Sequence, residues 1–211
     1  MSGAASILKK MLMALTGLAW FGFLVGHLSG NFLMFKGPEA FNHYAEFLES
    51  TGALLIAAEL GLIAFLALHV GTAAKLVLEN RSARRRGYAV SATNGQASWG
   101  SRTMAVAGTI LLAFIILHVR QFKFGDHTQE FGLWGLVIRS FQDPLVVGGY
   151  VVAMLALGLH LSHGFGSAFQ SLGVIRPTWR ANLRILGVAF GWAIALGFIS
   201  LPVYAFFFES A

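Results

Sequence analysis

The chain has no cysteine and few charged residues. Without cysteine, its 211 residues can form no disulfide, no thiolate-held iron–sulfur cluster and no cysteine-ligated haem. Charged residues make up 11% of the sequence, well below the roughly 25% that is usual in soluble domains. Apolar residues make up 56%, and the mean hydropathy is +0.69. This composition argues against a soluble globular domain and favours a protein that lies mostly within a membrane.

The apolar residues fall into five long runs. Runs of about 18 or more mostly apolar residues are long enough to cross a bilayer as helices. The runs cover residues 11–35, 53–78, 103–124, 144–170 and 182–208. They leave no room for a separate soluble domain, so we expect one all-α integral membrane domain over residues 1–211. The N-terminus lacks a small-residue cleavage site, and we expect it to begin a retained helix instead of a signal peptide.

The basic residues predict the orientation of these spans. Eleven of the fifteen Lys and Arg lie at the N-terminus, near the loop after the second span, or in the loop after the fourth. Cytoplasmic loops carry an excess of Lys and Arg. We therefore expect a multi-pass protein of the bacterial cytoplasmic membrane, with its N-terminus in the cytoplasm and its C-terminus outside. The net charge of +6 then reflects topology, and no nucleic-acid partner is expected. Residues 130–142 predict a short helix on the outer interface.

Histidine is the most informative residue type in the spans. Each of the first four spans carries histidine well inside it, and the fifth carries none. The five histidines concerned are His27, His69, His118, His160 and His163. Ionisable residues are costly in hydrocarbon and are functional-site candidates by default. One such residue could simply bond a neighbouring helix, but histidines in four successive spans favour a shared function.

The depths of these histidines sort them into two levels. His27 and His118 lie nearer the outer ends of their spans, and His69 and His160 lie nearer the cytoplasmic ends. At 1.5 Å per helical residue, the two levels differ by about 10–15 Å. Two imidazoles can fill both axial positions of a haem iron, whereas zinc takes three or four protein ligands. The sequence therefore predicts an antiparallel bundle of the first four spans around two bis-histidine haems. Spacing alone leaves open whether His160 or His163 binds iron.

Other polar residues lie close to the two histidine levels. At the outer level, they could line the site of a quinone headgroup, with Glu59 exchanging protons, or could organise loops and helix ends; they are Ser29, Asn31, His43 and Glu59. At the inner level, three residues are candidate partners of haem propionates; they are Arg102, His163 and Gln170.

Several segments around these histidines carry a resemblance to a known family. They read MALTGLAWFGFLVGHLSGN, FNHYAEFL, LALHV, SRTMAVAG with LHV after it, and GLHLSHGFGSAFQSLG. Together they resemble the single-chain, five-helix cytochrome b subunit of succinate dehydrogenases and fumarate reductases, the di-haem cytochrome b558 group. The resemblance implies that His27 and His118 bind the outer haem, and His69 and His160 the inner one. It favours His160 over His163 because the family ligand has a glycine thirteen positions on, which His160 matches with Gly173.

The resemblance also implies a function. The chain would be the membrane anchor of a succinate:quinone oxidoreductase, passing electrons between a cytoplasmic iron–sulfur subunit, two b haems and a membrane quinone, menaquinone or ubiquinone. As the non-flavin subunit of this enzyme it would react with quinone, and the dicarboxylate chemistry would belong to a separate flavoprotein subunit. Its partners would be these two subunits, the quinone and membrane lipid. Two alternatives are the cytochrome b of a hydrogenase or formate dehydrogenase, and a polytopic proton-coupled transporter.

Overall fold

The regular elements of the described chain are all helices. A computed structural model describes residues 3–83, 99–128, 130–174 and 176–209. The elements in order are α1 (Gly3–Asn31), η1 (Phe32–Lys36), α2 (Pro38–Ser50), α3 (Ala53–Ala83), α4 (Trp99–His118), η2 (Val119–Lys123), α5 (Gly132–Ser140), α6 (Pro144–Ser171), η3 (Pro177–Trp179) and α7 (Arg180–Phe208). The expected all-α class is confirmed.

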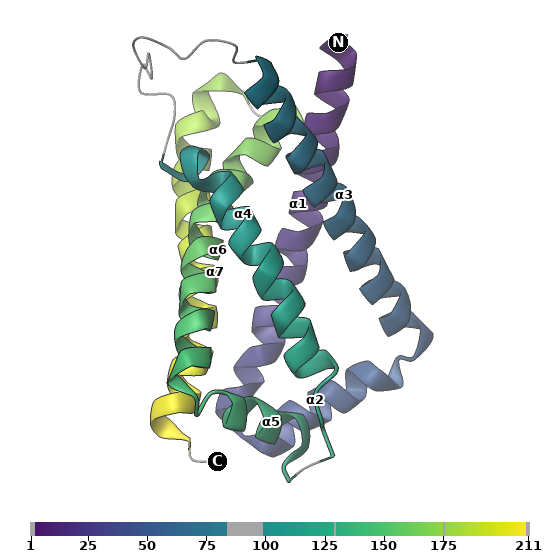
Figure 1. The fold of residues 1–211 in the computed structure, drawn as a ribbon, viewed down its shortest axis with the longest axis vertical. Helices are drawn as coiled ribbons and strands as arrows, with labels where there is room; N and C mark the ends of the chain where they lie inside the picture. The colour runs from purple at the N-terminus through teal and green to yellow at the C-terminus, as the bar shows by residue number, and fades with distance from the viewer. Residues whose placement is uncertain (1–2, 84–98, 129, 175, 210–211) are drawn as a thin grey trace.

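Five of the helical segments are long and apolar enough to cross a membrane. They cover Ile7–Lys36, Ala53–Glu79, Thr103–Lys123, Pro144–Ser171 and Arg180–Phe208. The five spans expected from the sequence agree with these segments to within a few residues. The long helices run alternately between the two ends of the molecule, so the N-terminus and the C-terminus lie at opposite ends (Figure 1). This arrangement is that of a multi-pass membrane protein.

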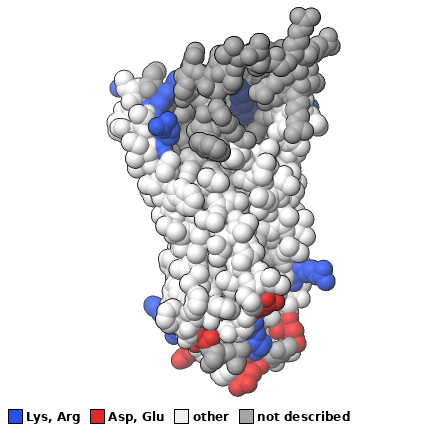
Figure 2. Space-filling model, turned by 60° about the vertical axis from the view of Figure 1, so that its left-hand side comes forward, with Lys and Arg blue, Asp and Glu red and all other residues white. Residues whose placement is uncertain are grey.

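Charged residues are concentrated at the two ends of the molecule. In the space-filling view, the middle of the visible face carries neither Lys and Arg nor Asp and Glu (Figure 2). Eight of the nine acidic residues belong to the end that carries the C-terminus; they are Glu39, Glu46, Glu49, Glu59, Asp126, Glu130, Asp143 and Glu209. The remaining one, Glu79, lies near the end of α3 that approaches the N-terminus of the chain. The two ends therefore differ in charge, with the basic excess on the N-terminal side.

The long helices pack in a definite order. α3 packs mainly on α1, α1 also packs on α6, and α6 packs on α4. α7 lies along α6 in the most extensive helix contact of the described chain. Small residues permit this close approach: a Cβ atom added to Gly191 of α7 would lie 2.8 Å from the backbone nitrogen of Ser162 on α6. Among these four helices, the described residues make no extensive contact between α3 and α6, between α1 and α4, or between α3 and α4.

A short helix that the sequence analysis does not anticipate follows the first span. α2 begins after Gly37, whose φ of +90° suits glycine. Pro38 at its first position and Glu39 in its first turn are typical of a helix start, because proline needs no partner for a backbone N–H there and a carboxylate complements the helix dipole. α2 lies beside α5 at the C-terminal end of the molecule (Figure 1).

The short helix expected within residues 130–142 is present as α5, and its apolar residues pack into the core of the protein. Its residues Trp134 and Ile138 are 8% and 1% exposed, and Phe141, just after it, is 4% exposed, whereas Phe131 is largely exposed. Asn42 of α2 holds the start of α5 by donating to the Phe131 carbonyl at 2.8 Å and accepting from the Trp134 backbone N–H at 2.9 Å. The second contact satisfies one of the backbone donors that every helix start leaves unpaired.

Candidate functional site

The four span histidines meet in two pairs. The rings of His27 on α1 and His118 on α4 have centroids 5.9 Å apart and planes at 85°. The rings of His69 on α3 and His160 on α6 have centroids 6.3 Å apart and planes at 61°. We call these the outer pair and the inner pair. The pairing is the one that the sequence predicts from depth alone.

Each pair joins two helices that lack extensive contact with each other. The outer pair joins α1 to α4, and the inner pair joins α3 to α6, which are two of the three non-adjacent combinations in the order α3–α1–α6–α4. The side chains must therefore point from opposite helices toward a common interior. A pair of residues that only stitched neighbouring helices together would lie on adjacent members of this order.

The separation of the two pairs along the bundle can be estimated independently on two helices. On α1, the inner pair is marked by Thr16, whose Oγ1 lies 3.2 Å from His69 Nδ1, and the outer pair by His27, eleven residues later. On α4, the inner pair is marked by Gly108, where an added Cβ would lie 3.5 Å from His160 Cε1, and the outer pair by His118, ten residues later. At 1.5 Å per residue, both helices give a separation of about 15 Å along the bundle.

The hydrogen bonds of Thr16 indicate the proton position on His69. The Thr16 hydroxyl donates to the Leu12 carbonyl at 2.8 Å and also lies 3.2 Å from the Met13 carbonyl, so its hydrogen is directed to the backbone and its oxygen is available to His69 as an acceptor. His69 therefore carries its hydrogen on Nδ1, and its Nε2 has a free lone pair. A neutral imidazole with Nε2 free and Nδ1–H held by a protein acceptor is the usual state of a metal-binding histidine.

His118 is held in the same state by a tyrosine. Tyr150 Oη on α6 donates to Gln121 Oε1 at 3.0 Å and lies 3.2 Å from His118 Nδ1. Because the tyrosine hydrogen is directed to the amide oxygen, Oη accepts from His118 Nδ1–H, which leaves Nε2 of His118 free. Phe114 stacks on the His118 ring at 5.4 Å, and Phe141 packs edge-on against Tyr150 at 4.9 Å. Aromatic contacts thus hold both partners of this hydrogen bond.

A π-turn begins directly after His118. The segment η2 is a single π-helical turn, with the Phe124 backbone N–H donating to the Val119 carbonyl at 3.3 Å. Such turns are rare and occur often at functional sites. Within this turn, Gln121 reaches Tyr150 on α6, and Lys123 reaches Glu59 on α3. The turn therefore connects the end of α4 to two other helices next to a site histidine.

The two pairs fit the axial ligation of a haem iron. An imidazole nitrogen binds a metal at about 2 Å and the ring centre lies about 1 Å behind it, so two rings on one iron have centroids about 6 Å apart. The observed separations are 5.9 and 6.3 Å. Among the described residues, no group of three or more His, Asp and Glu side chains gathers as a metal site. Two neutral imidazoles per site suit an iron whose remaining ligands come from a porphyrin better than they suit zinc.

The rings of the other two histidines, His27 and His160, are held less firmly by hydrogen bonds. Asn31 Nδ2 lies 3.4 Å from Nδ1 and 3.5 Å from Nε2 of His27, and Phe23 stacks on the same ring at 5.1 Å. His160 Nδ1 is buried and has no hydrogen-bond partner among the described residues. In each pair, one imidazole is thus fixed by a hydroxyl group and its partner is not.

The inner-side propionate candidates occupy different surroundings. His163 lies one turn beyond His160, and its Nε2 is 3.1 Å from Ser167 Oγ. The ring that faces His69 is that of His160. Gln170 is exposed near the end of α6. The side chain of Arg102 lies outside the described residues. Iron ligation by His160 and not by His163 stays a prediction that this geometry favours.

The four quinone candidates lie in different local surroundings. Asn31 donates to the His27 carbonyl at 2.8 Å and is the candidate nearest to the outer pair. Ser29 is exposed and donates to the Val25 carbonyl. His43 borders an open surface depression formed with Lys36, Glu39 and Ala40.

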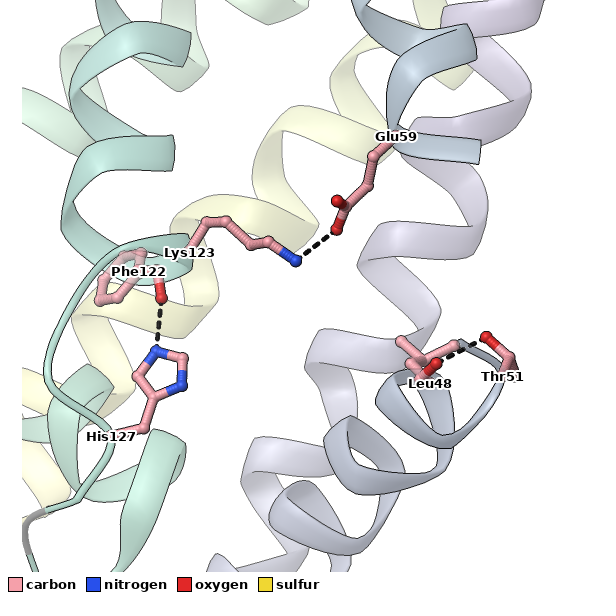
Figure 3. A network of polar contacts seen from close by, with 6 residues as sticks. All are labelled: Leu48, Thr51, Glu59, Phe122, Lys123 and His127. Atoms are coloured by element: carbon pink, nitrogen blue, oxygen red, sulfur yellow. Dashed lines mark hydrogen bonds and ion pairs between the residues drawn. The ribbon is translucent and has the colours of Figure 1, made fainter. Parts of the chain in front are cut away.

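The fourth candidate, Glu59, forms an ion pair. Its Oε1 lies 2.5 Å from Lys123 Nζ, and the two side chains are 37% and 47% exposed. Figure 3 shows this contact bridging from α3 to η2, beside the hydrogen bond of 2.6 Å between His127 Nε2 and the Phe122 carbonyl. The same view includes the bond of Thr51 to the Leu48 carbonyl at the end of α2. Of the two roles considered for Glu59, the structure displays the contact with a neighbouring helix.

The sequence analysis did not identify Thr16, Tyr150 and Gln121. Their depth was a usable signal, because Thr16 lies eleven residues before His27 and Tyr150 ten residues before His160. Each is therefore about 15 Å from the histidine of its own helix and level with the other pair.

Comparison with known protein families, with curated proteins and with solved structures gives no match to this chain.

Proposed function

We propose that the chain is the membrane-anchor cytochrome b of a succinate:quinone oxidoreductase, and that it binds two b haems among its first four spanning helices. One observation carries the proposal: two histidine pairs with ring separations of 5.9 and 6.3 Å lie about 15 Å apart in depth and join opposite helices. The resemblance of the histidine-bearing segments to the di-haem cytochrome b558 group supports the more specific assignment.

The protein's part in this function is to supply and orient the ligands. Each pair offers two imidazoles, and His69 and His118 have Nε2 free because Thr16 and Tyr150 occupy their Nδ1–H groups. Iron bound between two imidazoles exchanges single electrons and has no open axial position for O₂. The outer pair also lies against the Phe23 and Phe114 rings, which stack on the two imidazoles. Two such sites at different depths suit transfer of electrons along the membrane normal.

Charge supports the proposed orientation and partners. The N-terminal side carries the basic excess and the opposite end holds eight of the nine acidic residues, which agrees with a cytoplasmic N-terminus. A basic cytoplasmic face suits docking of the iron–sulfur and flavoprotein subunits, because complementary charge steers association. The quinone, menaquinone or ubiquinone, would react at the outer end, where Asn31 contacts the His27 backbone.

The test is purification of the native complex, followed by haem assay and identification of the co-purified chains. We expect two protohaems per chain, a low-spin spectrum that carbon monoxide does not change, and co-purification of a flavoprotein and an iron–sulfur protein. His43→Ala is a suitable control, because His43 is exposed on α2, and it should keep both haems. Absence of haem from the purified complex would refute the assignment as a cytochrome. Co-purification of hydrogenase or formate dehydrogenase subunits would assign the chain to another oxidoreductase.

A further inference from the structure

We propose that Thr16 and Tyr150 are positioning residues, one for each haem, which set the preference of the two irons for the ferric state. This inference rests on the proposed function. Neither residue would touch iron. Each accepts the Nδ1–H of one axial histidine, with a distance of 3.2 Å in both cases. The two contacts are chemically parallel although they come from different helices and different residue types.

The Thr16 contact belongs to the inner pair. Thr16 is 2% exposed, and its hydroxyl hydrogen is already directed to the Leu12 carbonyl. Its oxygen therefore faces His69 as a buried acceptor, beside the Met13 backbone, which also forms a hydrogen bond with His69. Gly17, the next residue, lies so close to the same ring that an added Cβ would be 3.3 Å from His69 Cε1. The hydroxyl group and the glycine together determine how the ring is turned.

The Tyr150 contact belongs to the outer pair and is part of a longer chain. His118 Nδ1–H donates to Tyr150 Oη, which donates to Gln121 Oε1. Gln121 lies in the π-turn that starts after His118, so this chain of bonds returns to the same helix end that carries the ligand. Polarisation along successive hydrogen bonds strengthens each of them. We therefore expect Gln121 to contribute to the outer site through Tyr150.

The direction of the effect follows from the chemistry of imidazole. An acceptor on Nδ1–H increases the basicity of the ligating nitrogen, and a more basic ligand stabilises ferric iron over ferrous iron. Removing the acceptor should therefore raise the midpoint potential of that haem. A tenfold weaker preference for ferric iron corresponds to about 59 mV for a one-electron couple, and we expect shifts of this order.

The variants are Tyr150→Phe and Thr16→Val, with Thr16→Ser as the variant that restores a hydroxyl. Two matched controls exist in the chain. Thr109→Val removes a hydroxyl that bonds the Ala105 carbonyl one turn back, as Thr16 bonds Leu12, but that forms no hydrogen bond with a histidine among the described residues. Tyr204→Phe removes a hydroxyl that donates to Glu209 at 2.6 Å.

The measurement is a redox titration of each haem in the purified complex, with the low-spin electron paramagnetic resonance signals recorded alongside. Loss of a component in His27→Ala identifies the outer haem. We expect Tyr150→Phe to raise only the outer potential and Thr16→Val only the inner one, with Thr16→Ser near the wild-type value and both controls unchanged.

Three outcomes would overturn the inference. They are unchanged potentials and signals in both variants, a shift of the wrong haem, or equal shifts in the controls. If Tyr150→Phe loses the haem altogether, Gln121→Leu replaces it, and a raised outer potential there supports the chain of bonds while an unchanged one refutes it. Failure of the proposed function is distinguishable, because the unaltered complex would then contain no haem to titrate.

Discussion

The glycine beside the inner pair provides the sharpest test of the site geometry. A methyl group introduced by Gly17→Ala would lie 3.3 Å from His69 Cε1 and 3.7 Å from its Nδ1. Carbon atoms in contact are normally about 3.5–4.0 Å apart, so the ring must withdraw by at least about 0.2 Å. The Thr16 hydroxyl, 3.2 Å from the same Nδ1, limits the directions in which the ring can move.

Two effects of this substitution oppose each other. Alanine is a better helix former than glycine by about 1 kcal/mol, which should stabilise α1. Metal–ligand distances, however, tolerate only about ±0.2 Å, and disturbing the groups around a ligand costs about 10–100-fold in metal affinity. We expect the affinity for the inner haem alone to fall by the lower end of this range, about tenfold or 1.4 kcal/mol. The haem-free fold should therefore be at least as stable as before, while the inner haem binds more weakly.

The assay is haem titration of the haem-free protein, with thermal unfolding measured in parallel. Gly108→Ala should have little effect, because its methyl group would lie 3.5 Å from His160 Cε1, an ordinary contact. Gly22→Ala is the control, since nothing lies within 4 Å of a Cβ at that position. The reasoning fails if Gly17→Ala binds both haems with wild-type affinity, or if Gly22→Ala weakens haem binding as much as Gly17→Ala does.

Two further predictions concern the ligands and the ion pair between Glu59 and Lys123. Replacing either member of the outer pair by leucine should remove one component of the reduced-minus-oxidised spectrum, and replacing either member of the inner pair should remove the other. The His163→Leu variant should keep both components. If it loses one haem while the His160→Leu variant keeps both, the choice of His160 as the α6 ligand is wrong. Glu59→Gln should lower stability by about 0.2–1 kcal/mol, because the pair with Lys123 is more than one-third exposed. Thermal unfolding should show this difference shrinking at high salt, and a deficit that persists at high salt would indicate another role for Glu59.

The sequence was sufficient for the spans and for the pairing of the histidines. Apolar length alone locates a membrane helix, since the hydrocarbon thickness sets how many residues are needed. Depth then follows from counting residues along each span, and alternating direction relates one span to the next. This is why His27 could be matched with His118, and His69 with His160, before any side chain was placed.

The features that were missed depend on the rotation and local winding of the helices. Residue counting gives a level but not a direction, so it could not tell that Tyr150 faces His118 while other residues at its level face elsewhere. The π-turn after His118 also escapes counting, because its extra residue changes the faces of Gln121 and Lys123 without changing their hydropathy. α2 was missed because thirteen residues of mixed polarity resemble a loop when only membrane spans are sought.

The one-sided packing of α3 has a consequence for the order in which the protein assembles. Thr72 is the only buried residue of the described part of α3, and the helix packs mainly on α1. Lys9 with Glu79, at 2.6 Å, and Lys123 with Glu59 fasten its two ends. In lipid there is no hydrophobic force between helices, so association depends on such packing and polar contacts. We expect α6 and α7 to join first and α3 last, so that His69 is the final ligand to arrive and the inner site is completed only when α3 docks.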